Sequence, residues 1–238
     1  MQIYVIDAGN TTIKLGSFNE GQLHNVQRFD RNQIDDLLTE LRERTAKKIV
    51  ISSVVNNAVS DALLNEFDGF VVHHQMNLPL KMEYRTPDSL GIDRLCNAVA
   101  VHKEMKTEFG VSIDVGTCIK FDLVHQEKGY IGGSIAPGID LRFKSLNDYT
   151  EKLPLLSNKS SVAFVGNNTE TSIRSGVMNG INAEMAGFVT QYESLFDSLT
   201  FFMTGGDASY FDIQVKNDIF ADENLTLKGL FEIYKHNA

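Results

Sequence analysis

Two stretches of the chain decide the fold: Ile3-Tyr4-Val5-Ile6-Asp7-Ala8-Gly9-Asn10-Thr11 at its start and Val111-Ser112-Ile113-Asp114-Val115-Gly116-Thr117 near its middle. Each is a short β-rich run that ends in Asp-x-Gly and a threonine, and each is followed by a second apolar run, a turn and a third run. The two aspartates lie 107 residues apart (114 − 7). Two unrelated hairpins could look alike, but the shared register of Asp, Gly and Thr favours a duplicated α/β architecture.

The hydrophobic pattern of the remaining sequence predicts alternating helices and strands. Helical spacing of apolar residues is found around residues 34–44, 59–67, 93–108 and 168–199. Short apolar, β-rich runs predict strands at 3–6, 13–18, 23–29, 48–53, 70–72, 111–113, 119–124, 130–136 and 200–203. No Ser/Gly-rich linker separates the halves, so we expect two closely packed domains, at residues 1–109 and 110–238.

The composition excludes several classes of protein. Of the 238 residues, 42% are hydrophobic and 22% are charged, which is incompatible with wholesale disorder or a fibrous repeat. The net charge is −9 and no cluster of Lys and Arg forms a basic face, so no nucleic-acid partner is expected. No run approaches about 18 apolar residues, and the first residues carry no positive segment, so we expect no membrane span and a cytoplasmic location.

The first turn has the residue types of a phosphate-binding element. It reads Asp7-Ala8-Gly9-Asn10-Thr11-Thr12-Ile13-Lys14. A glycine at a tight turn lets backbone N–H groups approach an anion, and threonine hydroxyls and a lysine ammonium donate to phosphate oxygens. The aspartate would face a metal ion or metal-bound water, because two bare anions repel each other. The alternative is an ordinary hairpin turn, and this stretch alone does not decide between the two.

The second turn and a glycine pair near the C-terminus strengthen the first interpretation. Asp114-Val115-Gly116-Thr117 repeats the turn, and Thr204-Gly205-Gly206-Asp207 follows an apolar strand. Two such hairpins and a Gly-Gly turn near the adenosine, in this order, resemble the nucleotide clamp of the actin, sugar-kinase and heat-shock-chaperone ATPases. The resemblance implies duplicated actin/ribonuclease-H-like domains, each a mixed sheet flanked by helices, with an interdomain nucleotide cleft.

Six elements in order make the chain similar to the type III pantothenate kinases along nearly its whole length. Besides the two aspartate turns, they are Gly91-Ile92-Asp93-Arg94, Gly132-Gly133-Ser134-Ile135-Ala136-Pro137-Gly138, Lys152-Leu153-Pro154 and Leu225-Thr226-Leu227-Lys228-Gly229-Leu230. The resemblance implies ATP-dependent phosphorylation of pantothenate to 4′-phosphopantothenate, the first step of coenzyme A biosynthesis. It also implies Mg²⁺ with the ATP, a monovalent cation (K⁺ or NH₄⁺) and a homodimer.

The same resemblance assigns roles to individual positions. The residues from Asp7 to Lys14, together with Thr117, would hold ATP. Asp93 would be the proton acceptor, and Asp114 would bind the monovalent cation. Pantothenate would contact Tyr84, Gly91, Ile92, Asp93, Arg94 and Thr169, the last within Gly166-Asn167-Asn168-Thr169 and often from the partner subunit.

The expected chemistry is consistent with these residue types. Phosphoryl transfer to an alcohol requires alignment, neutralisation of charge and a base for the hydroxyl proton. Asp93 alone could equally be a first-turn acid that stabilises a helix dipole, and Arg94 could be its structural partner. Within the surrounding motifs we expect Asp93 to be the base and Arg94 to bind the pantothenate carboxylate.

Two other functions stay open on the sequence alone. One is a kinase of the same superfold for another small molecule, such as a sugar, although the zinc-binding cysteine cluster that sugar kinases often carry is missing: Cys96 and Cys118 form no such pattern. The other is a catalytically silent relative with a regulatory or transcription-accessory role. The intact set Asp7, Asp93 and Asp114 favours an active enzyme.

Overall fold

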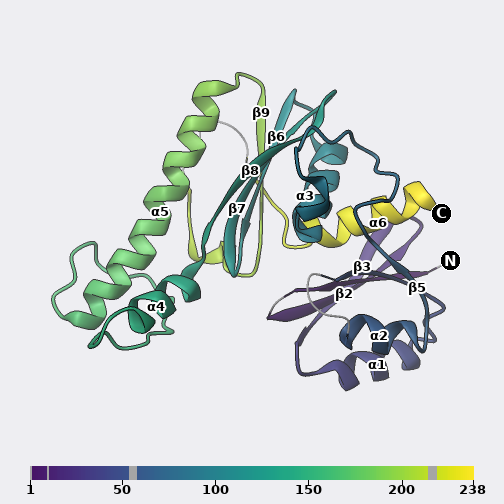
Figure 1. Cartoon of the computed structure of the whole chain (residues 1–238), viewed down its shortest axis with the longest axis horizontal. Helices are drawn as coiled ribbons and strands as arrows, with labels where there is room; N and C mark the ends of the chain where they lie inside the picture. Colours follow the sequence, from purple (N-terminus) through teal and green to yellow (C-terminus); the bar gives the residue numbers. More distant parts are fainter. Residues whose placement is uncertain (1, 10, 54–57, 214–218) are drawn as a thin grey trace. The chain divides into compact units, whose positions relative to one another are not determined.

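The computed structural model describes residues 2–9, 11–53, 58–213 and 219–238. These residues form two compact units (Figure 1). The first contains residues 1–104, 127–132 and 224–238, and the second contains 105–126 and 133–223. A division into contiguous domains at residue 109/110 stays a prediction; the compact units differ from it chiefly because the C-terminal helix packs in the first unit.

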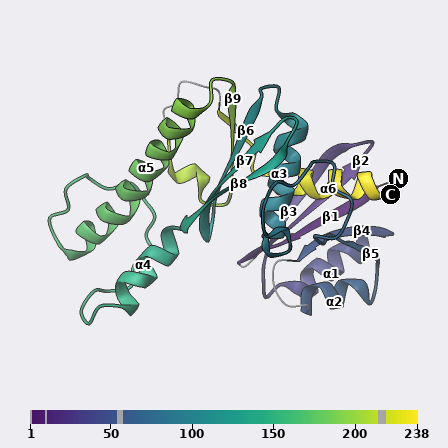
Figure 2. The same cartoon turned by 45° about the horizontal axis from the view of Figure 1, so that its top comes forward.

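The sheet of the first unit has the strand order β3-β2-β1-β4-β5. Its strands are β1 (Ile3–Ala8), β2 (Thr12–Asn19), β3 (Gln22–Asp30), β4 (Lys48–Ser53) and β5 (Asp68–Val71). The first three are antiparallel, and β4 and β5 add on in parallel. The helices α1 (Ile34–Glu43) and α2 (Ala58–Leu64) cover one face, and their leucines complete the core there (Figures 1 and 2).

The sheet of the second unit repeats this order, as β8-β7-β6-β9-β10. Its strands are β6 (Phe109–Val115), β7 (Cys118–His125), β8 (Gly129–Pro137), β9 (Leu199–Thr204) and β10 (Ile219–Ala221). Here too the first pair is antiparallel, and β9 and β10 add on in parallel. Two mixed sheets with one strand order confirm the predicted α/β class and the duplication.

The C-terminal helix α6 (Leu225–Asn237) belongs to the first unit and packs on α3 (Ile92–Glu104). The contact requires Gly229, because a Cβ there would lie 1.9 Å from the Cys96 carbonyl oxygen. A buried hydrogen bond of 2.9 Å from Thr226 Oγ1 to Asn97 Oδ1 joins the same two helices. In both views α6 lies on the face of the sheet opposite α1 and α2 (Figures 1 and 2).

The remaining helices belong to the second unit. They are α4 (Ile139–Asp148) and the long α5 (Thr169–Leu195), with single 3₁₀ turns at Ala208–Tyr210 and, in the first unit, at Pro87–Ser89. Phe188 of α5 stacks on Phe121 of β7, with ring centroids 4.5 Å apart, so α5 covers that strand. None of the helices in the described part of the chain is long and apolar enough to cross a membrane.

Candidate functional site

Asp7 is held at the carboxyl end of β1 by the neighbouring strand. Ser52 on β4 is its register partner, and the fully buried Ser52 hydroxyl donates a 2.6 Å hydrogen bond to Asp7 Oδ1. The strands are parallel, so both residues lie at the edge where the first turn begins. The bond fixes the orientation of a half-buried carboxylate.

The turn after Asp7 is tight. The Gly9 N–H donates to the Thr12 carbonyl at 3.0 Å, and a Cβ on Gly9 would lie 3.1 Å from the same oxygen. Thr11 and Thr12 are exposed, and Lys14 on β2 is the direct cross-strand partner of Asp7. Hydroxyl and ammonium donors therefore follow the turn, as a phosphate site needs. Asn10 lies outside the described residues, while Ala8 and Ile13 are buried beside the turn.

The start of α3 carries the expected catalytic carboxylate. Asp93 is half-buried in the first helical turn, and Arg94, only 5% exposed, lies inside the protein with Ile92. Gly91 makes room for the acid: a Cβ at Gly91 would lie 2.4 Å from Asp93 Oδ1. The glycine of Gly-x-Asp-Arg is therefore a steric requirement of the carboxylate's position.

The carboxylates of Asp7 and Asp93 both belong to the first unit. Both act on Cys96, which is fully buried in α3. Burial raises the pKa of the Cys96 thiol well above its usual value, and the negative charges of Asp7 and Asp93 raise it further. The carboxylates of Asp7 and Asp93 therefore both lie within electrostatic reach of Cys96, and Cys96 is an inert core thiol.

Tyr84 packs against the beginning of β8. Its ring meets Tyr130 edge to face, with centroids 5.5 Å apart, and lies next to Gly132. An isolated bridge between Met82 and Tyr130 fixes the segment backbone. Tyr84 therefore belongs to the first unit, as do Gly91 and Asp93.

A histidine contact near this segment was not foreseen from the sequence. The His74 Nε2 hydrogen-bonds the carbonyl oxygen of Leu90, the residue before Gly91. The described residues, His73 and His74 included, contain no group of three His, Cys, Asp or Glu side chains that could hold a metal ion. His74 instead anchors the chain just before α3.

In the second unit the turn after β6 is framed by backbone from two other motifs. The Gly138 N–H donates to the Thr117 carbonyl at 3.0 Å, and the Asp207 N–H donates to the Val115 carbonyl at 2.9 Å. Cβ atoms at Gly138 and Gly205 would lie 2.1 Å and 2.2 Å from carbonyl oxygens of this turn. The structure therefore brings together the second aspartate turn, the Pro-Gly element and the Gly-Gly turn, with Thr117 exposed at their meeting point.

Asp114 already has a cationic partner, which the sequence analysis missed. Lys120 on β7 is its direct cross-strand neighbour, and Lys120 Nζ lies 2.7 Å from Asp114 Oδ2. The side chains are only 13% and 12% exposed. The register follows from the antiparallel hairpin, but sequence spacing alone did not indicate that the lysine and the aspartate share a face.

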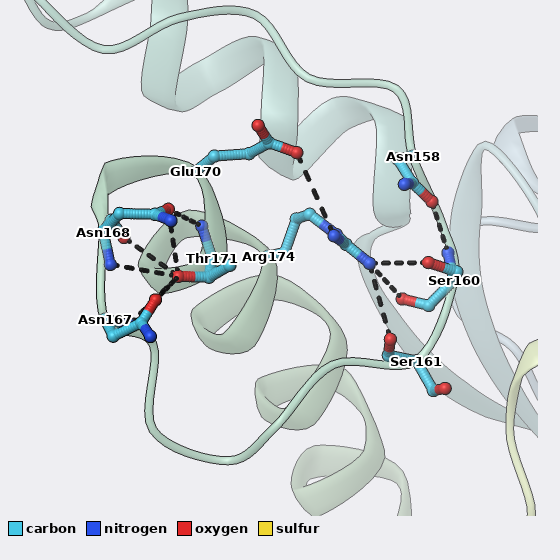
Figure 3. A network of polar contacts seen from close by, with 8 residues as sticks. All are labelled: Asn158, Ser160, Ser161, Asn167, Asn168, Glu170, Thr171 and Arg174. Carbon is cyan, nitrogen blue, oxygen red and sulfur yellow. Dashed lines mark hydrogen bonds and ion pairs between the residues drawn. The ribbon is translucent and has the colours of Figure 1, made fainter.

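Thr169 lies apart from that turn, as the first residue of α5. In Figures 1 and 2 this end of α5 extends away from the strands, beside α4. Asn168 and Thr171 form a capping box, and Arg174 binds the Ser160 hydroxyl and the carbonyls of Ser160 and Ser161 (Figure 3). The helix start is therefore rigidly held while Thr169 itself is exposed.

The model of the type III pantothenate kinase family matches residues 3–191. A type III pantothenate kinase of Phocaeicola vulgatus is 38% identical over 236 residues, covering 98% of each chain. That of Christiangramia forsetii is 37% identical over 237 residues, again covering 98% of each. The chain belongs to the type III pantothenate kinase family. The family suggested by the sequence motifs, and with it the expectation of a phosphotransferase, is thereby confirmed.

Solved structures agree on the fold of this type III pantothenate kinase family member. A Campylobacter jejuni protein titled as a Baf-family transcriptional activator has a TM-score of 0.61 at 22% identity, covering 98% of each chain. A Listeria monocytogenes protein titled as an N-acetylmannosamine kinase has a TM-score of 0.56 at 12% identity, covering all of both chains. At these identities the likeness shows the actin-like kinase fold alone.

The steric relation between Gly91 and Asp93 yields a test of the carboxylate that is predicted to be catalytic. We expect Gly91→Ala to lower kcat about tenfold or more, because the new Cβ displaces the carboxylate and misplacement of a reacting group is costly. Gly187→Ala in α5 is the control, since its Cβ would meet no atom within 4 Å. Steady-state kinetics on both variants measure the effect. An unchanged kcat in Gly91→Ala would mean that the position of Asp93 does not limit turnover.

Proposed function

We propose that this protein phosphorylates the primary hydroxyl of pantothenate with ATP, giving 4′-phosphopantothenate for coenzyme A biosynthesis in the cytoplasm. One observation supports this beyond family membership: Ser52 orients the Asp7 carboxylate at the phosphate-type turn, and Gly91 leaves room for the Asp93 carboxylate at the start of α3, in the same unit. A donor-rich turn beside a carboxylate is the arrangement that transfer from a nucleotide to an alcohol requires.

Each residue has a distinct task in this mechanism. The Gly9 turn, with Thr11, Thr12 and Lys14, donates hydrogen bonds to phosphate oxygens, and Thr117 at the turn after β6 carries a hydroxyl of the same kind. The Asp93 carboxylate accepts the hydroxyl proton as the oxygen attacks the γ-phosphorus in line. No phospho-enzyme forms, because the acceptor hydroxyl attacks directly.

Magnesium fits the residues of the first turn. A carboxylate beside phosphate oxygens is the hard oxygen donor set that Mg²⁺ prefers, and the Ser52 bond holds Asp7 in a fixed orientation there. When bound, Mg²⁺ neutralises charge on the phosphates. Asp7 would hold it, directly or through water, together with the nucleotide.

Pantothenate would be recognised at the start of α3. Tyr84 offers an aromatic face packed beside Gly132, and Gly91 and Ile92 shape the backbone before Asp93. Arg94 matches the carboxylate of pantothenate, which a guanidinium binds bidentately. Thr169, which the resemblance also implies as a pantothenate contact, carries an exposed hydroxyl at the start of α5.

We propose a homodimer as the working form. Thr169 is exposed on its capped helix start, and the nearby Phe164 and Val165 are 82% and 79% exposed. Adjacent large apolar side chains left this exposed are candidates for burial against a second chain. Light scattering coupled to size exclusion should give the mass of two chains, and Phe164→Asp should shift it to that of one.

The decisive assay measures ADP release from ATP with Mg²⁺ and a panel of acceptors: pantothenate, glucose and N-acetylmannosamine. We expect turnover with pantothenate alone. Turnover only with a hexose would replace the proposal by the sugar-kinase alternative. Turnover with none of them, in a folded protein, would favour the regulatory alternative.

The monovalent cation that the resemblance implies at Asp114 does not fit the residues of this chain. Lys120 Nζ already lies 2.7 Å from Asp114 Oδ2, in a pair that is almost closed to solvent. A second cation at this carboxylate would lie beside a like charge. We therefore derive no step through K⁺ or NH₄⁺.

A further inference from the structure

The pair of Asp114 and Lys120 has the geometry of a permanent cation site. The residues face each other directly across the antiparallel strands β6 and β7, just before and after the second aspartate turn. Their charged atoms are 2.7 Å apart, and about seven-eighths of each side chain is buried. The Lys120 side chain is therefore long enough to place one positive charge at the Asp114 carboxylate, where the family resemblance implies a free cation.

The Lys120 head group and a free ammonium ion have the same chemistry. A lysine head group is an ammonium with three N–H donors on a flexible stem, and ammonium is one of the two ions that the resemblance implies. Because the stem is part of β7, the ammonium is present at every concentration of external salt. A buried ion pair is also screened by salt far less than an exposed one.

We infer that Lys120 supplies the monovalent cation of this enzyme from within the chain, so that its kinase activity needs neither K⁺ nor NH₄⁺. The inference rests on the proposed pantothenate kinase function and specifies its cofactor requirement. Lys120 acts as a positioning residue: it holds the charge at Asp114 and thereby the turn that carries Thr117.

The chain offers a matched control for this pair. Lys48 and Asp68 are also direct partners on neighbouring strands, β4 and β5, with Nζ and Oδ2 2.8 Å apart. That pair is more exposed, since 70% of the Asp68 side chain is open to solvent, and it lies at no predicted site. A cation effect specific to Lys120 must be absent when Lys48 is changed in the same way.

The experiment compares wild type, Lys120→Thr and Lys48→Thr in KCl, NH₄Cl, NaCl and tetramethylammonium chloride at equal ionic strength. Threonine suits a strand and offers an oxygen to a free cation. We expect wild-type kcat/KM to agree within about twofold across the salts, whereas Lys120→Thr should lose about tenfold or more in NaCl and recover in KCl or NH₄Cl. Lys48→Thr should behave like wild type.

A second readout is independent of activity. Binding of K⁺ to the vacated carboxylate should raise the Tm of Lys120→Thr in KCl above its Tm in NaCl, by mass action. Wild type and the double variant Asp114→Asn, Lys120→Thr should show no such difference. If Lys120→Thr folds only in KCl or NH₄Cl, that too supports the inference.

Three results would overturn the inference while leaving the proposed function intact. The first is a wild-type enzyme that turns over pantothenate in KCl but not in NaCl. The second is a Lys120→Thr variant with a raised KM for ATP that no cation restores, which would make Lys120 a phosphate ligand. The third is a Lys120→Thr variant that behaves like wild type in every salt. Wild type without pantothenate turnover in any salt refutes the proposed function instead.

Discussion

Asp93→Asn should lower kcat by about two to four orders of magnitude while leaving the fold and ATP binding nearly unchanged. Asparagine has the shape of aspartate but cannot accept the hydroxyl proton as the phosphoryl group is transferred. The substitution adds no bulk, so the room that Gly91 leaves for the side chain is sufficient for the amide. The loss should appear in kcat rather than in the KM for ATP, because the proposed role of the carboxylate is at the acceptor hydroxyl.

A nearby acid provides the control for Asp93→Asn. Asp88 lies five positions earlier in the 3₁₀ turn Pro87–Ser89 and is exposed. Asp88→Asn also removes one negative charge, from the segment just before α3, and should keep the activity of wild type. Single-turnover measurements with both variants separate the chemical step from product release. Turnover of Asp93→Asn near the wild-type rate would remove Asp93 from the mechanism.

The elements that sequence analysis predicted best are those with strong local patterns. β4 was predicted at 48–53 and is found at Lys48–Ser53, because a continuous buried β-branched run has few alternatives. The helix predicted over 93–108 ends earlier, at Glu104, because Phe109 pairs with Leu199 and His125 at the start of β6. Tertiary pairing thus ended a helix that local periodicity extended.

Two helices, α4 and α6, were not predicted from the sequence. Neither α4 nor α6 has a side chain that caps its N-terminus, although the family motif at 225–230 lies within α6. The helix α6 also contains Gly229, which weakens the helical pattern and is needed only because α3 lies so close. Its position in the first unit depends on contacts with residues more than a hundred positions away, which no local pattern contains.

The site shows the same division between local and long-range information. The turn glycines and the acids of the motifs could be named from the sequence, since each motif is contiguous. The partners that position them could not: Ser52 reaches Asp7 across parallel strands, and Lys120 reaches Asp114 through the register of a hairpin. Such partners are found only when the strand register is known.

Gly205→Ala should disrupt the second unit at the turn that the sequence assigned to adenosine. Gly205 has φ +102°, a conformation that costs a residue with a side chain about 1–3 kcal/mol. Its Cβ would also lie 2.2 Å from the Val115 carbonyl oxygen and 2.5 Å from the Val115 carbonyl carbon and amide nitrogen. Backbone cannot rotate away as a side chain can, so the turn after β6 must shift as a whole.

The shift should be visible both in stability and in nucleotide binding. The displaced Val115 carbonyl accepts the hydrogen bond from the Asp207 N–H, at 2.9 Å. The Gly-Gly turn and the second aspartate turn should therefore be displaced together. We expect a lower Tm and a KM for ATP raised about tenfold or more, since small displacements of positioning groups have large kinetic effects. Thermal melting and ATP titration at saturating pantothenate measure the two effects.

The adjacent Gly206 provides the control for Gly205→Ala. A Cβ at Gly206 would meet no atom within 4 Å, and its φ lies outside the left-handed region. Gly206→Ala should therefore keep the Tm and the KM for ATP of wild type, although it changes the same dipeptide by the same methyl group. Equal impairment of the two variants would contradict this prediction. The effect would then come from added methyl groups near the nucleotide, and not from the close packing of Gly205 on Val115.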